Sequence, residues 1–279
     1  MPLSTLQVVL TGTPDDAVTL RSAFAIARPC AGHVDACLVL PHPARVIHAA
    51  DLYESTEDRQ TLFEQLRRQA RETFDTETQR ADVSTRDTPD LSGALMASYR
   101  EASGEIAPCL REMSPFADLV VFPPLVGPGP GGVEDAFLES LIAGHAAVLL
   151  VPRKAPQAIG RRIAIGWDGG LAAAHALAAA IPLLETCERA VLLSVADGPP
   201  PDATEALAYL ALHGVAARTC TVAQDGLPVA RRLAEAALHE GCDLLVAGGY
   251  GHSRTLESVF GGTTERLTSH SDLPLFLLH

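Results

Sequence analysis

The chain has 279 residues, of which 47% are hydrophobic and only 5% aromatic, and its formal net charge at pH 7 is −13. The length allows two ordinary domains, while the acidic charge and the lack of a long basic run argue against nucleic-acid or anionic-membrane binding as the main activity. Because the six cysteines form no C-x-x-C pair and no stretch reaches the ~20 apolar residues of a membrane span, we expect a cytoplasmic protein.

Short apolar runs alternate with helical patterns, which indicates an α/β fold with parallel sheets. The first half contains a strand, an alanine-rich helix, a second strand, a charged helical region and two closing strands, at 7–10, 17–27, 34–40, 51–79, 117–122 and 147–151. Nearly the same order returns in the second half, without the charged region, at 162–166, 171–184, 190–195, 242–247 and 274–278. The sequence therefore predicts one α/β unit repeated in tandem.

The stretch at 152–156 is polar and flanked by prolines, as a boundary between domains should be. It predicts one domain at 1–156 and a second at 157–279. The last strand of each domain is short and apolar, and an exposed strand of that kind invites pairing along its edge. Two arrangements stay open: the domains pair these edges as an internal pseudo-dimer, or they are independent domains on a linker. A homodimer of two chains is a further expectation.

The glycine-rich segment at 248–264 follows an apolar run and precedes an amphipathic stretch at 265–270. Gly248, Gly251 and Gly261 stand there in a G-x2-G-x9-G spacing. A strand, a glycine-rich loop and the start of a helix together present backbone N–H groups to a phosphate. Glycine at 248 and 251 permits positive φ and close approach of the backbone to an anion. The alternative is a glycine-rich helix cap without a ligand.

Residues 243–254, 260–264 and 273–278 resemble the end of a universal stress protein domain, and residues 162–170 resemble its start. The resemblance covers essentially the whole chain, is strong in 160–279 and degenerate in 1–152, and the repeat is similar to the two-domain members of that family. It implies two tandem doubly wound domains, each a five-stranded, mostly parallel sheet with helices on both faces.

The same resemblance implies a site for ATP. In ATP-binding members the nucleotide lies across the carboxyl ends of the first and fourth strands, with an acidic residue near the adenine. Carried over to this chain, Asp168 approaches the adenine. The glycine-rich loop and its surroundings supply the remaining expected contacts, namely Gly248, Gly251, His252, Arg254, Gly261, Gly262, Thr263 and Thr264.

Some positions depart from the family motif. Gly262 stands where the motif has Ser or Thr, and Asp168 is followed by Gly169 and Gly170 where a Gly-Ser pair is more usual. The first half departs further, because Thr13 stands in the place of Asp168. Prolines at 123, 124, 128 and 130 also remove backbone N–H donors from its loop. We predict that the 1–156 domain binds no nucleotide.

The sequence contains no P-loop, no G-x-S-x-G elbow and no H-E-x-x-H pair. We therefore predict no catalytic and no metal-binding residues. We interpret the chain as a stress-response protein that binds ATP, with or without Mg²⁺, and acts as a sensing module and not as a dedicated enzyme. Two alternatives stay open: a ligand-free interaction scaffold, and a slow Mg-dependent ATPase built on the same crevice.

Overall fold

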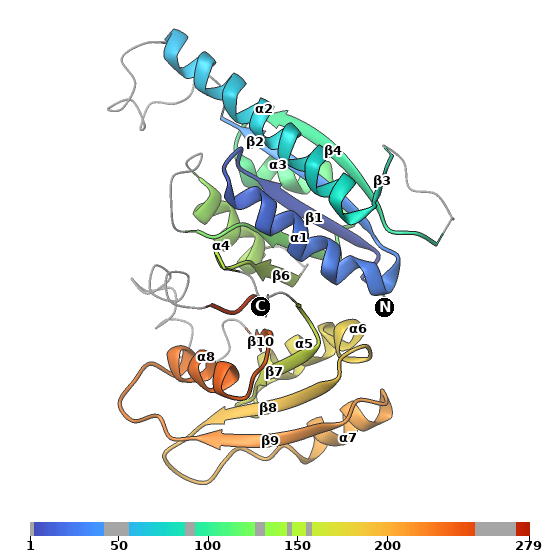
Figure 1. The fold of residues 1–279 in the computed structure, drawn as a ribbon. Helices are drawn as coiled ribbons and strands as arrows, with labels where there is room; N and C mark the ends of the chain where they lie inside the picture. The colour runs from blue at the N-terminus through green and yellow to red at the C-terminus, as the bar shows by residue number, and fades with distance from the viewer. Residues whose placement is uncertain are drawn as a thin grey trace. The chain divides into compact units, whose positions relative to one another are not determined.

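The computed structural model describes residues 3–41, 56–86, 93–125, 132–143, 147–154, 158–248 and 272–279 (Figure 1). Contacts divide the chain into two compact units, Leu3–Ala146 and Ala147–His279. The domain boundary predicted at residue 156 stays a prediction. Within the described ranges, no helix is long and apolar enough to cross a membrane.

The first unit contains a sheet of five parallel strands in the order β3-β4-β2-β1-β5. The strands are β1 Thr5–Leu10, β2 His33–Leu40, β3 Ser84–Thr85, β4 Met96–Ser103 and β5 Leu119–Phe122. Every residue of β2 and β5 is buried. This is expected of parallel strands covered on both faces. It explains why β5 is a continuous apolar run, whereas β2 is apolar except for the buried His33 and Asp35.

Helices cover both faces of this sheet. They are α1 Asp15–Ala27, α2 Thr56–Ala81, α3 Ile106–Met113 and α4 Val133–Ala143, with a short 3-10 turn at Arg28–Cys30. Because β1, β2 and β4 are successive neighbours, right-handed crossovers place α1 and α2 on the same face, where Figure 1 shows them side by side. The chain then crosses back from β4 to β5, which places α3 and its neighbour α4 on the opposite face.

The second unit repeats this plan with the parallel order β11-β10-β7-β8-β9, and β6 pairs antiparallel with β11. Its strands are β6 Ala147–Leu150, β7 Arg162–Gly166, β8 Arg189–Val195, β9 Ala217–Val222, β10 Leu244–Gly248 and β11 Leu275–Leu278. Its described helices are α5 Leu171–Ala179, α6 Ile181–Leu184, α7 Thr204–Leu212 and α8 Val229–His239. The return from β9 to β10 places α8 on the face opposite α5 and α7.

The predicted fold class is confirmed: each unit is a doubly wound sheet of five parallel strands with helices on both faces. Three of these strands, β3, β4 and β9, do not stand out in the sequence, and β3 has only two residues, both exposed. The second half of β4 is mostly exposed, and β9 lies at the edge of its sheet with no fully buried residue. Polar residues at such positions break the apolar runs by which the other strands are recognised.

Candidate functional site

The order of strands reverses between β7 and β10 in the second unit, and this is the point at which open α/β sheets bind ligands. Asp168 lies here, in the loop between β7 and α5, with an exposed side chain. Its Oδ1 accepts a hydrogen bond of 2.8 Å from the backbone N–H of Gly170, which holds the carboxylate at the start of α5. Gly169 between them has φ of 78°, a left-handed conformation that favours glycine.

Gly248 ends β10 beside this loop. The register pairs Val246 with Ile165, and its continuation brings Gly248 next to Trp167 on the neighbouring strand. The backbone of Gly248 is not left-handed, so conformational freedom is not the reason for a glycine here. A Cβ at this position would lie 2.3 Å from the carbonyl carbon and oxygen of Ala172. The glycine is therefore required because the first turn of α5 packs directly on the end of β10.

Trp167 is a residue of this region that the sequence analysis missed. Its indole Nε1–H donates to the carbonyl of Asp202 at 2.9 Å, and its own carbonyl accepts from the Ser194 hydroxyl at 2.8 Å. Asp202 in turn accepts from the backbone N–H and hydroxyl of Thr204, at 2.9 and 2.7 Å, and these bonds lower its pKa. These contacts fasten the loop that precedes α7 to the end of β7. One sequence signal could have identified it: Trp167 is the only tryptophan of the chain, and it directly precedes Asp168.

Two of the predicted nucleotide-binding residues, Asp168 and Gly248, thus lie together at the carboxyl ends of β7 and β10. The other seven lie outside the described residues; they are Gly251, His252, Arg254, Gly261, Gly262, Thr263 and Thr264. In the described ranges no group of three or more His, Cys, Asp or Glu side chains is arranged to hold a metal ion.

The two units can be compared directly, because an aspartate accepts hydrogen bonds from the backbone at the start of β1 in the first unit and of β7 in the second. Asp118 accepts from the backbone N–H groups of Ser4 and Thr5 at 2.8 and 2.9 Å. Asp243 accepts in the same way from Gly160 at 2.8 Å and from Arg162 at 3.2 Å. Each aspartate stands directly before its strand, β5 or β10, so the two units can be matched residue by residue.

This match corrects one prediction. Leu6 pairs with Leu119 and Ile163 pairs with Leu244, so five residues further along the strand Asp168 corresponds to Thr11 and not to Thr13. The next residues, Gly12 and Gly169, share a left-handed φ of 71° and 78°. The sequence comparison placed Thr13 there because residue types alone do not reveal the strand register.

The β1–α1 loop of the first unit is already bound to an anionic group of the same chain. The buried carboxylate of Asp16 accepts from the backbone N–H groups of Thr11 and Gly12 and from the Thr11 hydroxyl, each at 2.8 Å. Burial raises the pKa of Asp16 to about 6, although these three hydrogen bonds favour the charged form. By contrast, the first turn of α5 in the second unit contains no acidic residue.

Helix α2 also covers this loop. A Cβ at Gly12 would lie 2.6 Å from the carbonyl oxygen of Leu66 and 2.7 Å from its Cα, so the backbone of α2 is in contact with the end of β1. In the first unit, the N–H donors of the loop are occupied and the space above Gly12 is filled. These contacts distinguish the loop of the first unit from that of the second; that the first unit binds no nucleotide stays a prediction.

The molecule is thus a tandem α/β protein. In the part of the chain that the structure describes, the second unit presents the exposed carboxylate of Asp168 beside Gly248 at its topological switch point, whereas the first unit has Thr11 at the position of Asp168. No protein-family model matches the sequence, and no curated protein matches it. Solved structures do match it. A universal stress protein from Archaeoglobus fulgidus is 10% identical, with 99% of this chain and 96% of that chain covered at a TM-score of 0.64.

A second match is a protein from Pseudomonas aeruginosa that is described as a universal stress protein. It is 14% identical, and 99% of this chain and 93% of that chain are covered at a TM-score of 0.54. At such identities the likeness concerns the fold. Over nearly its whole length the chain has the fold of universal stress proteins, and the resemblance predicted from the sequence is confirmed at that level.

Proposed function

We propose that the protein is a stress-response protein of the universal stress protein type, whose second domain binds an adenine nucleotide. The observation that carries this proposal is the meeting of Asp168 and Gly248 at the switch point between β7 and β10, directly before the glycine-rich segment. ATP, with or without Mg²⁺, is the proposed ligand. The proposed role is binding or sensing, because the sequence offers no general base positioned to activate water.

The described residues fit the adenine side of such a ligand. Asp168 is exposed and anionic, and its carboxylate would accept a hydrogen bond from the amino group of adenine. The first turn of α5 contains no acidic residue that would repel the phosphates of a nucleotide. The G-x2-G-x9-G segment would supply N–H donors to the phosphates.

Calorimetric titration with ATP, ADP and AMP tests the proposal, and we expect one nucleotide bound per chain. Trp167 is the only tryptophan and precedes Asp168, so its fluorescence provides a second readout at the same loop. Two nucleotides bound per chain would contradict the interpretation that Asp16 and α2 block the β1–α1 loop of the first unit. No binding at millimolar nucleotide would leave the ligand-free scaffold as the better interpretation.

Two substitutions locate the nucleotide. Asp168→Ala should weaken ATP binding by roughly tenfold or more, because a hydrogen bond to a charged group contributes about 1.5–3 kcal/mol. Gly251→Val should abolish binding while the far-ultraviolet circular dichroism stays unchanged. Asp225→Ala is the matched control, since Asp225 is an exposed acid of the same unit that pairs with Arg232 at 3.2 Å. Unchanged affinity in both loop variants would place the nucleotide elsewhere.

The alternative of slow ATP hydrolysis would rest on the same crevice and on a metal ion that bridges the phosphates. Its test is the turnover of bound ATP with Mg²⁺ over hours. We further propose an internal pseudo-dimer of the two domains, as expected from the short apolar strands that close them. Light scattering distinguishes a single chain of 29.4 kDa from a homodimer of two chains.

A further inference from the structure

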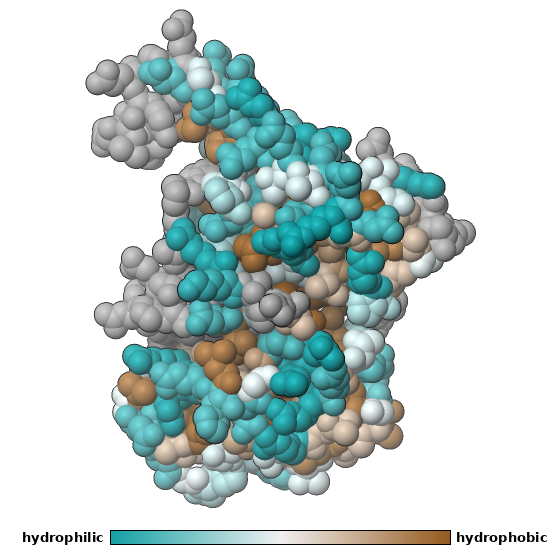
Figure 2. Space-filling model, in the orientation of Figure 1, coloured by the Kyte–Doolittle hydropathy of each residue, from teal (hydrophilic) through white to brown (hydrophobic). Residues whose placement is uncertain are grey.

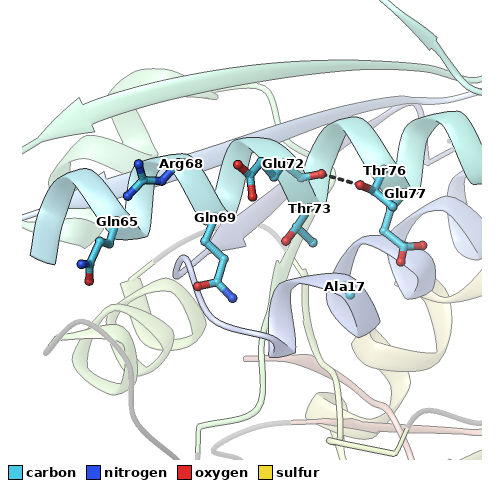
Figure 3. A pocket seen from close by; sticks show the side chains of 8 residues that line it. All are labelled: Ala17, Gln65, Arg68, Gln69, Glu72, Thr73, Thr76 and Glu77. Atoms are coloured by element: carbon cyan, nitrogen blue, oxygen red, sulfur yellow. Dashed lines mark hydrogen bonds between the residues drawn. The ribbon is translucent and has the colours of Figure 1, made fainter.

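A polar groove runs between α1 and α2 in the first unit, far along the chain from the proposed nucleotide site. It is open to solvent along its length and has a volume of about 620 Å³, a size that small-molecule sites also have. Seven of its eight lining residues come from α2, and only Ala17 comes from α1 (Figure 3). Because alanine has so small a side chain, the space beside α2 stays open.

The α2 residues that line the groove follow a regular spacing. Gln65, Gln69, Thr73 and Glu77 are four residues apart, so they form one stripe along the helix. Figure 3 shows Gln69, Thr73 and Glu77 extending from α2 on the side of α1. Over much of its length the outer surface of α2 is hydrophilic as well (Figure 2). The groove therefore offers hydroxyl, amide and carboxylate groups in a row.

Glu77 is the buried member of this stripe, with only 5% of its surface exposed. Its Oε2 is buried and has no hydrogen-bond partner in the described structure. Its Oε1 lies 3.7 Å from Nη1 of Arg21 and 3.8 Å from Nη1 of Arg80, distances that balance charge but exceed a hydrogen bond. A buried carboxylate oxygen without a donor is costly. The missing partner is therefore a hydrogen-bond donor, and no further positive charge is required.

The rest of the groove restricts the class of ligand. Among the described residues, no aromatic ring and no large apolar side chain lines it, so a flat apolar molecule would gain little there. Arg68 and the two glutamine amides are donors, while Glu72, Thr73 and the amide oxygens are acceptors. A neutral molecule with several hydroxyl groups matches this mixture, because each hydroxyl both donates and accepts.

We propose that the α1–α2 groove binds a small hydroxyl-rich molecule of the sugar or polyol class, with one hydroxyl donating to the carboxylate of Glu77. This site is separate from the nucleotide crevice and does not depend on the proposed function. It also gives a role to the long helix that distinguishes the first unit from the second. Helix α2 both covers the end of β1 and forms almost all of the new groove.

Titration of the ¹⁵N-labelled full chain with glucose, trehalose and glycerol tests this site. At millimolar concentrations at least one of these probes should shift amide signals of α1 and α2 and leave those of α5 and α8 unchanged. Glu77→Gln should weaken that binding about tenfold, because it replaces a charged acceptor. Thr73→Val removes a hydroxyl at nearly constant size and should weaken binding of the probe several-fold. It provides a second test if Glu77→Gln does not fold.

Glu64→Gln is the matched control, since Glu64 is an exposed glutamate of the same helix outside the groove, and it should bind like the wild type. Three results would overturn the proposal. The first is that no probe shifts these signals, which means that water alone satisfies Glu77. The second is binding of 1,4-diaminobutane in place of the polyols, which would make the groove a cation site. The third is polyol binding that is unaffected in the variants of Glu77 and Thr73.

Discussion

Gly248→Ala should destabilise the second unit severely, although it adds only one methyl group. The added Cβ would lie 2.3 Å from backbone atoms of Ala172 and 2.6 Å from the nitrogen of Ala173, so no side chain can rotate away to relieve the contact. Helix α5 would have to move off the sheet. We expect a loss of about 3 kcal/mol, at the upper end for overpacked cores, and a decrease of the Tm by roughly 10 °C.

Gly198→Ala is the matched control for this experiment. Gly198 lies in the same unit, and a Cβ there would meet nothing within 4 Å. Its variant should melt close to the wild type by differential scanning calorimetry. Because α5 begins beside Asp168, Gly248→Ala should also weaken nucleotide binding. A Tm of Gly248→Ala equal to that of Gly198→Ala would show that α5 moves at little cost, and that the contact does not explain the glycine.

The sequence was sufficient to predict the fold and the meeting of Asp168 with Gly248. The fold follows from local patterns, because most buried parallel strands are apolar runs. The meeting of Asp168 with Gly248 was implied by the resemblance to universal stress proteins, whose ligands lie across the carboxyl ends of neighbouring strands. The reason for Gly248 was not predictable, since it depends on the packing of helix α5, which lies far earlier in the chain, on the end of β10. Glycine has the same appearance in a sequence whether it serves a ligand, a turn or a close contact.

The first unit illustrates the same limit. The prolines of its loop and a threonine in the place of Asp168 predict that the first unit differs from the second. The threonine that corresponds to Asp168 is Thr11, however, and not Thr13. Neither the contact of Leu66 with Gly12 nor the hydrogen bonds of Asp16 leaves a signature in the sequence. An aspartate in the first turn of a helix is ordinary, and only the structure shows that this one turns back into the loop.

Asp16 should make the stability of the first unit depend on pH. Its pKa in the folded state is about 6 against an ordinary value of 3.8, because burial outweighs its hydrogen bonds. A carboxyl whose pKa is raised by folding contributes stability that is fully present below the unfolded pKa and is lost as the pH rises through 6. From this group alone, we expect the free energy of unfolding to increase by about 1 kcal/mol when the pH is lowered from 7 to 5.

Urea unfolding of the wild type and of Asp16→Asn at both pH values isolates this contribution, since other carboxylates act equally in both proteins. The asparagine variant should lack the additional stability at pH 5. It should also be less stable than the wild type at that pH, because its amide N–H₂ would face the N–H of Gly12, which donates to Oδ2 in the wild type. Asp15→Asn makes the same charge change one residue earlier and should keep most of the wild-type dependence on pH, because the charge of Asp15 is the smallest of the causes that shift the pKa of Asp16. If Asp16→Asn keeps the same dependence on pH, the Asp16 carboxylate is not buried against the N–H groups of Thr11 and Gly12. The β1–α1 loop would then be more open to an external anion than these hydrogen bonds indicate.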